Sequence, residues 1–380
     1  MKKSEELSRI NELTLKNLFH DSMGLNVEMC TYDNPLKGKW VIYERLKIIA
    51  PRFPSPDIMK FVMSQYDTRG GFHKILIRKL ARIGFLHSMG LLASKSMDID
   101  GIDSLGKNMI FWWRGRSMRL FDFSTGTVTC TLKEGLPKHL FVNSVSFRQK
   151  YKYPFLVDLL DSGETWFREV ILSGRTLGQV KNKTVYEKLI NDTINSMKQI
   201  SCDTITYKNH KEYTNQLRDE IMEKLSVCEK EKLITKIKIL NSLVDKLCLK
   251  AEKLDKPVPI VLSHSDLHPS NIWVDNNQQI SIIDWEANSF KSIWYDPATL
   301  LCKFRRSEGR RRMLLNCNDS SVIDAVLIND EQKKYNMESV MAILLLENII
   351  EIINILLDFP QENRLLLDGF TENLEKINWF

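Results

Sequence analysis

The stretch His264-Ser-Asp-Leu-His-Pro-Ser-Asn271, followed by Ile282-Ile-Asp-Trp-Glu286, decides the fold of this 380-residue chain. Asp266 precedes Asn271 by five positions, and Asp284 follows thirteen positions after that. A short β-prone run, a polar turn and a second alternating run lie between them, which predicts a β-hairpin. Because a hairpin brings its two ends together, we expect two carboxylates and one amide to converge.

Phosphoryl transfer from a nucleotide requires this set of side chains. One carboxylate accepts the proton of the attacking hydroxyl, while a carboxylate and an amide hold Mg²⁺ ions that neutralise the phosphates. The simpler alternative is a polar hairpin with a capped turn. The full His-x-Asp-x-x-x-x-Asn spacing, which is that of the protein-kinase catalytic loop, favours the kinase-type site.

On these residues the stretch resembles the Brenner motif of the aminoglycoside phosphotransferase and choline kinase superfamily, whose members have a protein-kinase-like fold. The resemblance is close over residues 261–301 and weaker from about residue 108 to the C-terminus. It implies that Asp266 is the catalytic base and that Asn271 and Asp284 are the metal ligands.

The resemblance also assigns supporting roles around the loop. His264 is expected to brace it through backbone hydrogen bonds, while the role of His268 stays open. Asp296, in Trp294-Tyr-Asp-Pro-Ala, is expected to be structural.

Composition describes an ordinary soluble globular protein, with 43% apolar and 27% charged residues. The seven cysteines are scattered and have no C-x-x-C spacing, which argues against a disulfide framework or zinc site and indicates a reducing compartment. The polar N-terminus lacks a signal-peptide run, so we expect a cytoplasmic protein. The longest apolar run, residues 340–357, contains four polar residues and predicts a buried helix.

The formal net charge of +6 is unevenly placed, because residues 68–97 carry six Lys and Arg but no Asp or Glu. Lys74, Arg78 and Arg82 would share one face of a helix. A solvated surface helix and a peripheral membrane or partner contact through residues 70–92 are both open. Without a reader motif, we expect no nucleic-acid partner. The layout resembles N-terminal extensions of uncharacterised bacterial phosphotransferases linked to surface-polysaccharide assembly.

Three β-prone runs between residues 109 and 133 predict the start of a kinase-like N-lobe. Gly115 lies in the first turn, either over the nucleotide phosphates or in an ordinary hairpin. Lys133 ends the third run, where a kinase-like fold places the lysine that reaches the phosphates. A solvated strand-end lysine is the equal alternative.

The helix that should supply the partner of this lysine has no acid, since no Glu occurs between residues 135 and 163. Ser144 stands roughly where the acid is expected. Another residue orients Lys133, or the register differs, or nucleotide binding is altered. Further on, Glu169, Val170 and Ile171 would present backbone groups to the nucleotide base, or form a plain strand.

Residues 181–252 read as two helices with apolar stripes, for which packing into a C-lobe is favoured over coiled-coil dimerisation. Five arginines between residues 305 and 312 bind an anionic ligand or lie on a solvated loop.

The sequence thus predicts an α+β, protein-kinase-like two-lobed fold. An N-terminal extension, largely helical, covers residues 1–100, a β-rich N-lobe 101–172, and a mainly helical C-lobe 173–380, with the catalytic loop at 264–271 and the metal strand at 280–286. The predicted reaction moves the γ-phosphoryl of ATP or GTP to a hydroxyl of a small molecule. The alternative is a catalytically weak or inactive nucleotide-binding or scaffold protein, peripheral to a membrane. The acceptor and the oligomeric state stay open.

Overall fold

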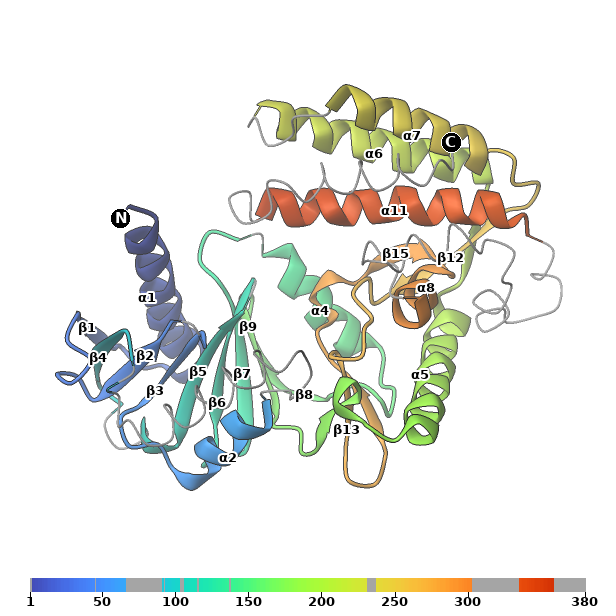
Figure 1. Ribbon diagram of the computed structural model, residues 1–380. Coiled ribbons are helices and arrows are strands. Elements are labelled where there is room, and N and C mark those ends of the chain that lie inside the picture. The colour runs from blue at the N-terminus through green and yellow to red at the C-terminus, as the bar shows by residue number, and fades with distance from the viewer. Residues whose placement is uncertain are drawn as a thin grey trace. The chain divides into compact units, whose positions relative to one another are not determined.

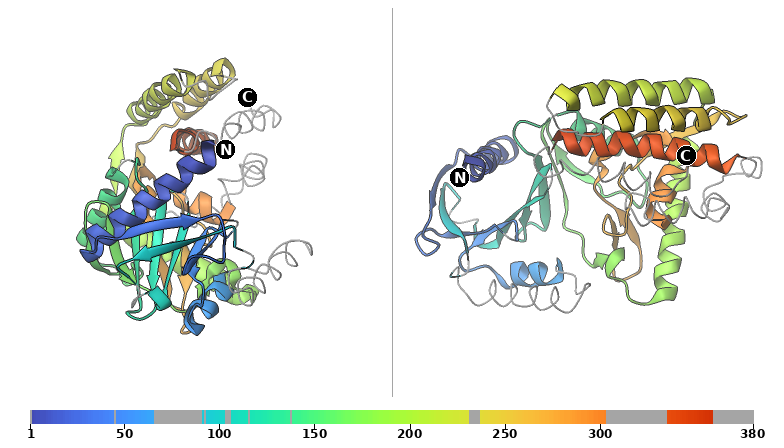
Figure 2. Two further views of the ribbon diagram at one scale, coloured as in Figure 1. Left: turned by 90° about the vertical axis from the view of Figure 1, so that its left-hand side faces the viewer. Right: turned by 45° about the horizontal axis from the view of Figure 1, so that its top comes forward.

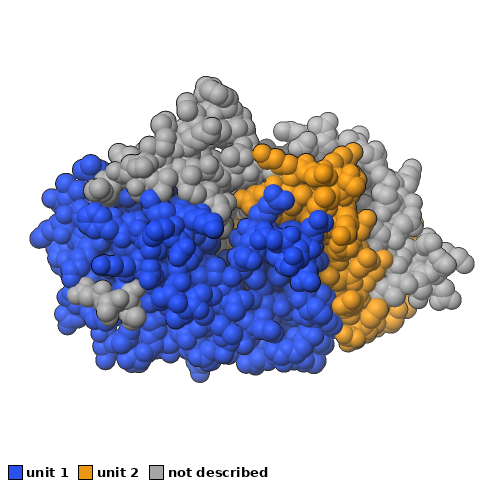
Figure 3. All heavy atoms as spheres, turned by 90° about the horizontal axis from the view of Figure 1, so that it is seen from below, with its two compact units in different colours: residues 1–175, 273–286 blue, residues 176–272, 287–380 orange. Residues whose placement is uncertain are grey.

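A computed structural model describes residues 2–44, 46–65, 91, 93–102, 106–114, 116–136, 138–230, 237–302 and 335–358. The chain forms two compact units, coloured separately in Figure 3. Unit 1 comprises residues 1–175 and 273–286, and unit 2 comprises residues 176–272 and 287–380. The predicted boundary near residue 100 therefore does not separate two bodies, and the predicted metal strand is counted with the N-terminal unit.

Unit 1 is built on a nine-stranded sheet of order β1-β4-β2-β3-β5-β6-β7-β9-β8, in which every neighbouring pair is antiparallel (Figure 1). The strands are β1 (Glu28–Tyr32), β2 (Trp40–Tyr43), β3 (Ile48–Pro51), β4 (Lys95–Asp100), β5 (Met109–Arg114), β6 (Ser117–Asp122), β7 (Thr127–Leu132), β8 (Leu159–Ser162) and β9 (Trp166–Val170). Strands β5, β6 and β7 are the three runs predicted for the N-lobe.

The N-terminal extension continues this sheet. Strand β3 pairs with β5 through Ile48 opposite Trp112 and Ile49 opposite Phe111. The extension contains the predicted N-terminal helix as α1 (Lys2–Met23), a second helix α2 (Pro56–Gln65), and four strands. Trp40–Tyr43 was the strand candidate in the sequence, and two of the other three strands, β1 and β4, are rich in polar residues.

Helices cover both faces of the sheet (Figure 2). On one face α1 packs Leu18 and Phe19 against Phe111. On the other face lie α2 and α4 (His139–Lys150), which follows β7 in the chain. Because successive strand residues point to opposite faces, Cys130 of β7 faces α4 and packs with Phe141.

Unit 2 is mainly helical. It contains α5 (Lys183–Thr204), α6 (His210–Lys230), α7 (Ile237–Ala251), α8 (Tyr295–Cys302), α11 (Met337–Asp358) and a sheet of β11 (Thr206–Lys208), β12 (Val258–Ser263) and β15 (Ser289–Ser292). Figure 1 shows α6 and α7 lying along α11. The two predicted apolar stripes are buried there, as Leu217 and Val244 illustrate. Packing inside the unit, which the sequence favoured over a coiled coil, is confirmed.

Helix α11 is the described helix that is long and apolar enough to cross a membrane, with 78% of its most apolar window buried. It packs against α6 and α7, and core helices of soluble proteins share this length and apolarity. It also carries the buried acids Glu347 and Glu351.

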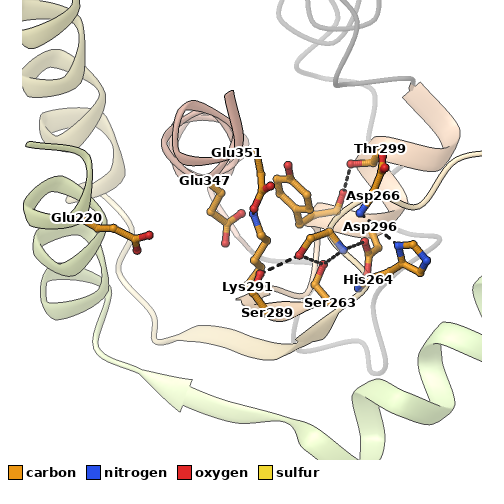
Figure 4. Close-up of polar contacts among 12 residues, drawn as sticks. Glu220, Ser263, His264, Asp266, Ser289, Lys291, Asp296, Thr299, Glu347 and Glu351 are labelled. Atoms are coloured by element: carbon orange, nitrogen blue, oxygen red, sulfur yellow. Dashed lines mark hydrogen bonds and ion pairs between the residues drawn. The ribbon is translucent and has the colours of Figure 1, made fainter. Parts of the chain in front are cut away.

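Those two acids hold β15 in place. The Lys291 ammonium lies 2.7 Å from a Glu351 carboxylate oxygen, as Figure 4 shows. Glu347 accepts the Ser292 N–H at 2.5 Å and the Tyr213 O–H at 2.6 Å. Because β15 pairs with β12, this buried polar group also supports the strand that enters the catalytic loop.

The predicted hairpin of the catalytic block is confirmed. Strands β13 (Ile272–Val274) and β14 (Ile280–Ile282) are neighbours in a small sheet with β10 (Arg175–Thr176). The turn between them is closed by the Gln279 carbonyl, which accepts the Asp275 N–H at 3.0 Å.

These elements confirm the kinase-like, two-lobed α+β fold. A β-sheet unit carries a helix between β7 and β8, and a helical unit carries the His-x-Asp loop after β12. Several predictions fall outside the described residues. These are residues 70–92 apart from Leu91, the turn residue Gly115, and the arginines between 305 and 312. None of the six described cysteines forms a disulfide.

Phe111 ties the extension to the N-lobe strands, and its burial leads to a first prediction. The ring is fully buried, with its centroid 5.7 Å from that of Phe19 and 5.4 Å from that of Trp40. We expect Phe111→Ala to lower the free energy of unfolding by about 3–5 kcal/mol, measured by urea denaturation followed by circular dichroism. The control Phe53→Ala, at a side chain 65% exposed, should change it by less than about 0.5 kcal/mol. Equally small effects would contradict a shared core.

Candidate active site

The catalytic loop follows β12 in unit 2 and is held by one buried carboxylate. Asp296, at the start of α8, accepts the His264 N–H at 2.7 Å and the Ser265 N–H at 3.1 Å (Figure 4). Ser265 has a φ of 64°, which a non-glycine residue rarely adopts, so the loop depends on these bonds. Burial raises the pKa of Asp296, although the N–H donors favour its charged form. Asp296 is structural, as expected.

Within the loop, hydrogen bonds fix Asp266 and Asn271 to each other. The buried His264 accepts the Asp266 N–H on Nδ1 at 3.3 Å, the bracing role that the resemblance implied. The Asn271 Nδ2 donates to the Asp266 carbonyl at 3.0 Å, and the Asn271 N–H donates to the His268 carbonyl at 2.8 Å. Since the amide nitrogen is used by the loop, the amide oxygen is the atom that suits a cation.

Asp266 itself is accessible, with 34% of its side chain exposed in a loop whose neighbours are largely buried. The His268 Nε2 lies 3.7 Å from the Asp266 Oδ1. His268 also caps the turn, because its Nδ1 accepts the Ser270 N–H at 3.2 Å. The loop thus presents one carboxylate with an imidazole beside it, an arrangement that can accept a proton from a hydroxyl.

The metal strand belongs to unit 1, where Asp284 has a φ of 66°. The next residue, Trp285, anchors this segment. Its indole N–H donates to the Ile282 carbonyl at 2.9 Å, and its ring centroid lies 4.5 Å from that of Phe147 in α4. Asp284 and Glu286 therefore flank a fixed, buried side chain. Their convergence with Asp266 and Asn271 stays a prediction.

Around Asp284 the sheet supplies a cation that the sequence analysis did not single out. The Arg119 guanidinium on β6 makes a hydrogen-bonded ion pair with Asp284 Oδ1. The Cys130 Sγ lies 3.6 Å from a Glu286 carboxylate oxygen. Burial, and next the charge of Asp284, raises the pKa of Glu286 to about 7. One guanidinium thus faces two acids.

These side chains fit a magnesium ion. Mg²⁺ takes oxygen ligands, commonly one or two carboxylates together with substrate phosphates rather than a cage of protein groups. The described residues contain no group of three or more His, Cys, Asp or Glu that could hold a metal. The Asp284 carboxylate in unit 1 and the Asn271 amide oxygen in unit 2 are each of the kind that Mg²⁺ binds, and that they share one ion stays a prediction. A divalent charge would relieve the repulsion between Asp284 and Glu286.

The expected clamp pairs a lysine of the sheet with a glutamate of α4. In this protein the two charges are exchanged, and a cation of α4 pairs with an acid of the sheet. Ser144 is buried where the acid was expected. One turn later Arg148 donates to Glu169 of β9 at 2.7 Å, with only 6% and 17% of the two side chains exposed. The helix therefore carries the cation, and the sheet carries the acid.

The groups predicted to meet the nucleotide base are used by the sheet. Glu169 pairs with Val128 on one side and Leu159 on the other. The Ile171 N–H donates to the Gly126 carbonyl at 2.8 Å, and Val170 pairs with Thr127. Glu169 thus lies between two neighbouring strands, while Val170 pairs with β7 alone, and contact of these residues with a nucleotide base stays a prediction.

Lys133 lies just beyond the end of β7, where its N–H donates to the Arg116 carbonyl at 3.0 Å. The two-residue period of the strand puts it out of phase with Cys130 and Arg119. The sequence around Lys133 and around Arg119 does not show which of these two cations lies near Asp284. Only the pairing register of β6 and β7 shows which cation shares a face with Asp284.

One family model matches part of the chain. Residues 173–335 match the model of the choline/ethanolamine kinase family, which confirms the resemblance to the superfamily over that part of the chain. No curated protein matches the chain. The match supports a small-molecule phosphotransferase.

Solved structures with a similar fold include small-molecule kinases. An ethanolamine kinase of Plasmodium vivax is 16% identical, with 80% of this chain and 89% of that chain covered and a TM-score of 0.47. The choline kinase LicA of Streptococcus pneumoniae is 12% identical, with 72% and 90% covered and a TM-score of 0.47. An ADP-bound aminoglycoside phosphotransferase, APH(2'')-Ib, is 14% identical, with 71% and 93% covered and a TM-score of 0.44.

Asp296 leads to a second prediction, because its removal leaves the buried His264 N–H without its acceptor and leaves the Ser265 N–H with the Ser263 Oγ alone, at 2.9 Å. We expect Asp296→Ala to lower the free energy of unfolding by about 2–5 kcal/mol, measured by urea denaturation. The control Asp245→Ala removes an exposed carboxylate paired with Arg218 and should cost less than about 1 kcal/mol. A loss for Asp296→Ala no larger than the control would show that the loop does not depend on this carboxylate.

Proposed function

We propose that this chain is a phosphotransferase that moves the γ-phosphoryl group of ATP, or of GTP, to a hydroxyl of a small molecule. The observation that carries the proposal is the loop of unit 2, in which Asp266 presents an accessible carboxylate while its backbone carbonyl accepts a hydrogen bond of 3.0 Å from the Asn271 Nδ2. A polar turn without a chemical task has no need of an exposed carboxylate built on buried supports.

In the proposed mechanism, Asp266 orients the acceptor hydroxyl and takes its proton as the oxygen attacks phosphorus. His264 and Asp296 hold the loop so that this carboxylate does not reorganise during the reaction. Asn271 and Asp284 would hold Mg²⁺, which supplies the positive charge that neutralises the phosphate oxygens. The His268 Nε2 lies 3.7 Å from the Asp266 Oδ1, where it can share the proton that Asp266 takes from the acceptor hydroxyl.

The family match sets the order in which acceptors are tested. Because residues 173–335 match the choline/ethanolamine kinase model, small amino alcohols are the first acceptors to test, followed by sugars. The match covers the region between β10 and α11, which includes the whole catalytic loop.

One observation favours a second candidate, a nucleotide-binding scaffold without catalysis. The acid expected on α4 is absent, and the Arg148–Glu169 pair runs in the opposite direction from the usual clamp. A scaffold of this kind would bind nucleotide but transfer no phosphate.

Asp266→Asn gives the third prediction and the test of the proposal. We expect the substitution to lower turnover by about 10²–10⁴-fold, because the acceptor hydroxyl loses its base. Nucleotide affinity should stay within about twofold, since Asp266 acts on the acceptor. Transfer of label from γ-labelled ATP to choline, ethanolamine and a sugar panel measures turnover, and isothermal titration calorimetry measures binding.

The control is Asp245→Asn, an exposed carboxylate on α7, which should transfer at the wild-type rate. Full turnover in Asp266→Asn would show that the mechanism is wrong. Nucleotide binding by the wild type, without transfer to any acceptor or to water, would favour the scaffold.

A further inference from the structure

The inner face of the unit 1 sheet, which packs against α4, lacks the lysine that a kinase-like lobe normally carries. In that fold the lysine stands on the third strand of the lobe and pairs with an acid of the following helix. Here the third strand is β7, whose residues on this face are Val128, Cys130 and Leu132. Cys130 is 2% exposed, and burial raises the pKa of its thiol well above the usual range, so it stays neutral. Strand β7 supplies no cation to this face.

The adjacent strand supplies one. Arg119 of β6 lies directly opposite Cys130 in the antiparallel pairing, so the two side chains share the face. Its guanidinium reaches Asp284, the proposed metal ligand. The side chain keeps 27% of its surface exposed, and a guanidinium has five N–H donors, of which this contact uses a part.

The surroundings of Cys130 explain why the cation stands on β6. Phe167 of β9 pairs with Cys130 on the other side of β7, and the Arg148 guanidinium of α4 lies 4.1 Å from the centre of the Phe167 ring. A lysine at position 130 would stand close to this second buried cation and would compete with it for Glu169. With Arg148 on α4, the positive charge that serves Asp284 has to come from the other neighbouring strand.

We propose that Arg119 takes the place of the missing third-strand lysine, positioning the Asp284 carboxylate and binding an oxygen of the nucleotide polyphosphate. The inference deepens the proposed function and rests on it. Arg119 takes this role in place of Lys133, because Lys133 lies beyond the end of β7 and out of phase with this face. It also names the polyphosphate, rather than the base or the acceptor, as the part of the substrates that Arg119 contacts.

The test compares ATP with adenosine in two variants, and it is the fourth prediction. Arg119→Gln removes the charge and should weaken ATP binding by about tenfold to a hundredfold, as expected for a lost charge-assisted hydrogen bond, while adenosine affinity stays unchanged. Arg119→Lys keeps the charge but not the planar fork, and it should recover part of the loss. Calorimetry with ATP, ATP plus Mg²⁺, and adenosine gives the affinities. In transfer assays the KM for ATP should rise, and the KM for the acceptor should not.

Arg168→Gln is the matched control, because Arg168 is also a strand arginine but binds the Ser22 carbonyl and Thr129 on the opposite face. It should lower stability and leave the ratio of ATP to adenosine affinity at the wild-type value. The inference is overturned if Arg119→Gln keeps wild-type ATP affinity, or loses ATP and adenosine equally, or if Arg168→Gln loses ATP selectively. A wild-type protein that binds no nucleotide refutes the proposed function itself, and it does so before any variant is compared.

Discussion

The ion pair between Arg119 and Asp284 joins the sheet of unit 1 to the acidic residues that follow β14, and the proposed site in this unit depends on it. Two acids, Asp284 and Glu286, stand two residues apart at a largely buried strand end. Burial, and next the repulsion from the neighbouring Asp284 carboxylate, raises the pKa of Glu286. A positive charge must lie beside them, and the register of β6 and β7 brings Arg119 there. A divalent ion suits the same place, because one guanidinium compensates only part of the negative charge of the two carboxylates.

In unit 2 a buried carboxylate, Asp296, holds the backbone of the catalytic loop. The backbone turns sharply at Ser265, and two N–H groups in the turn point into a buried region. Asp296 accepts both, so a single buried carboxylate shapes the loop. Asp266 in the same loop is half-buried, and its carboxylate stays accessible. Acids with structural tasks are buried and hydrogen-bonded, while the acid proposed for catalysis keeps contact with solvent.

The catalytic loop could be predicted from sequence because its chemistry depends on residue types at a fixed, local spacing. His264, Asp266 and Asn271 bond to one another within eight residues, and the hairpin after them follows from its alternation and polar turn. Arg119 could not be found this way. Its importance comes from pairing with β7 and from contact with a residue 165 positions away, and neither leaves a mark in the sequence around it. The strands of the extension other than Trp40–Tyr43 were not predicted for a similar reason. Short strands such as Ile48–Pro51 gain their stability from a neighbour in an existing sheet.

The central claim is that Asp266, Asn271 and Asp284 form one magnesium–nucleotide site. It is tested most directly by a crystal structure of the protein with a non-hydrolysable ATP analogue and Mn²⁺ in place of Mg²⁺, in which anomalous scattering locates the metal. The account predicts a metal peak bonded to an Asp284 carboxylate oxygen and the Asn271 amide oxygen, with the γ-phosphate directed toward Asp266. A nucleotide bound without metal at Asp284, or a metal bound away from both residues, would contradict it.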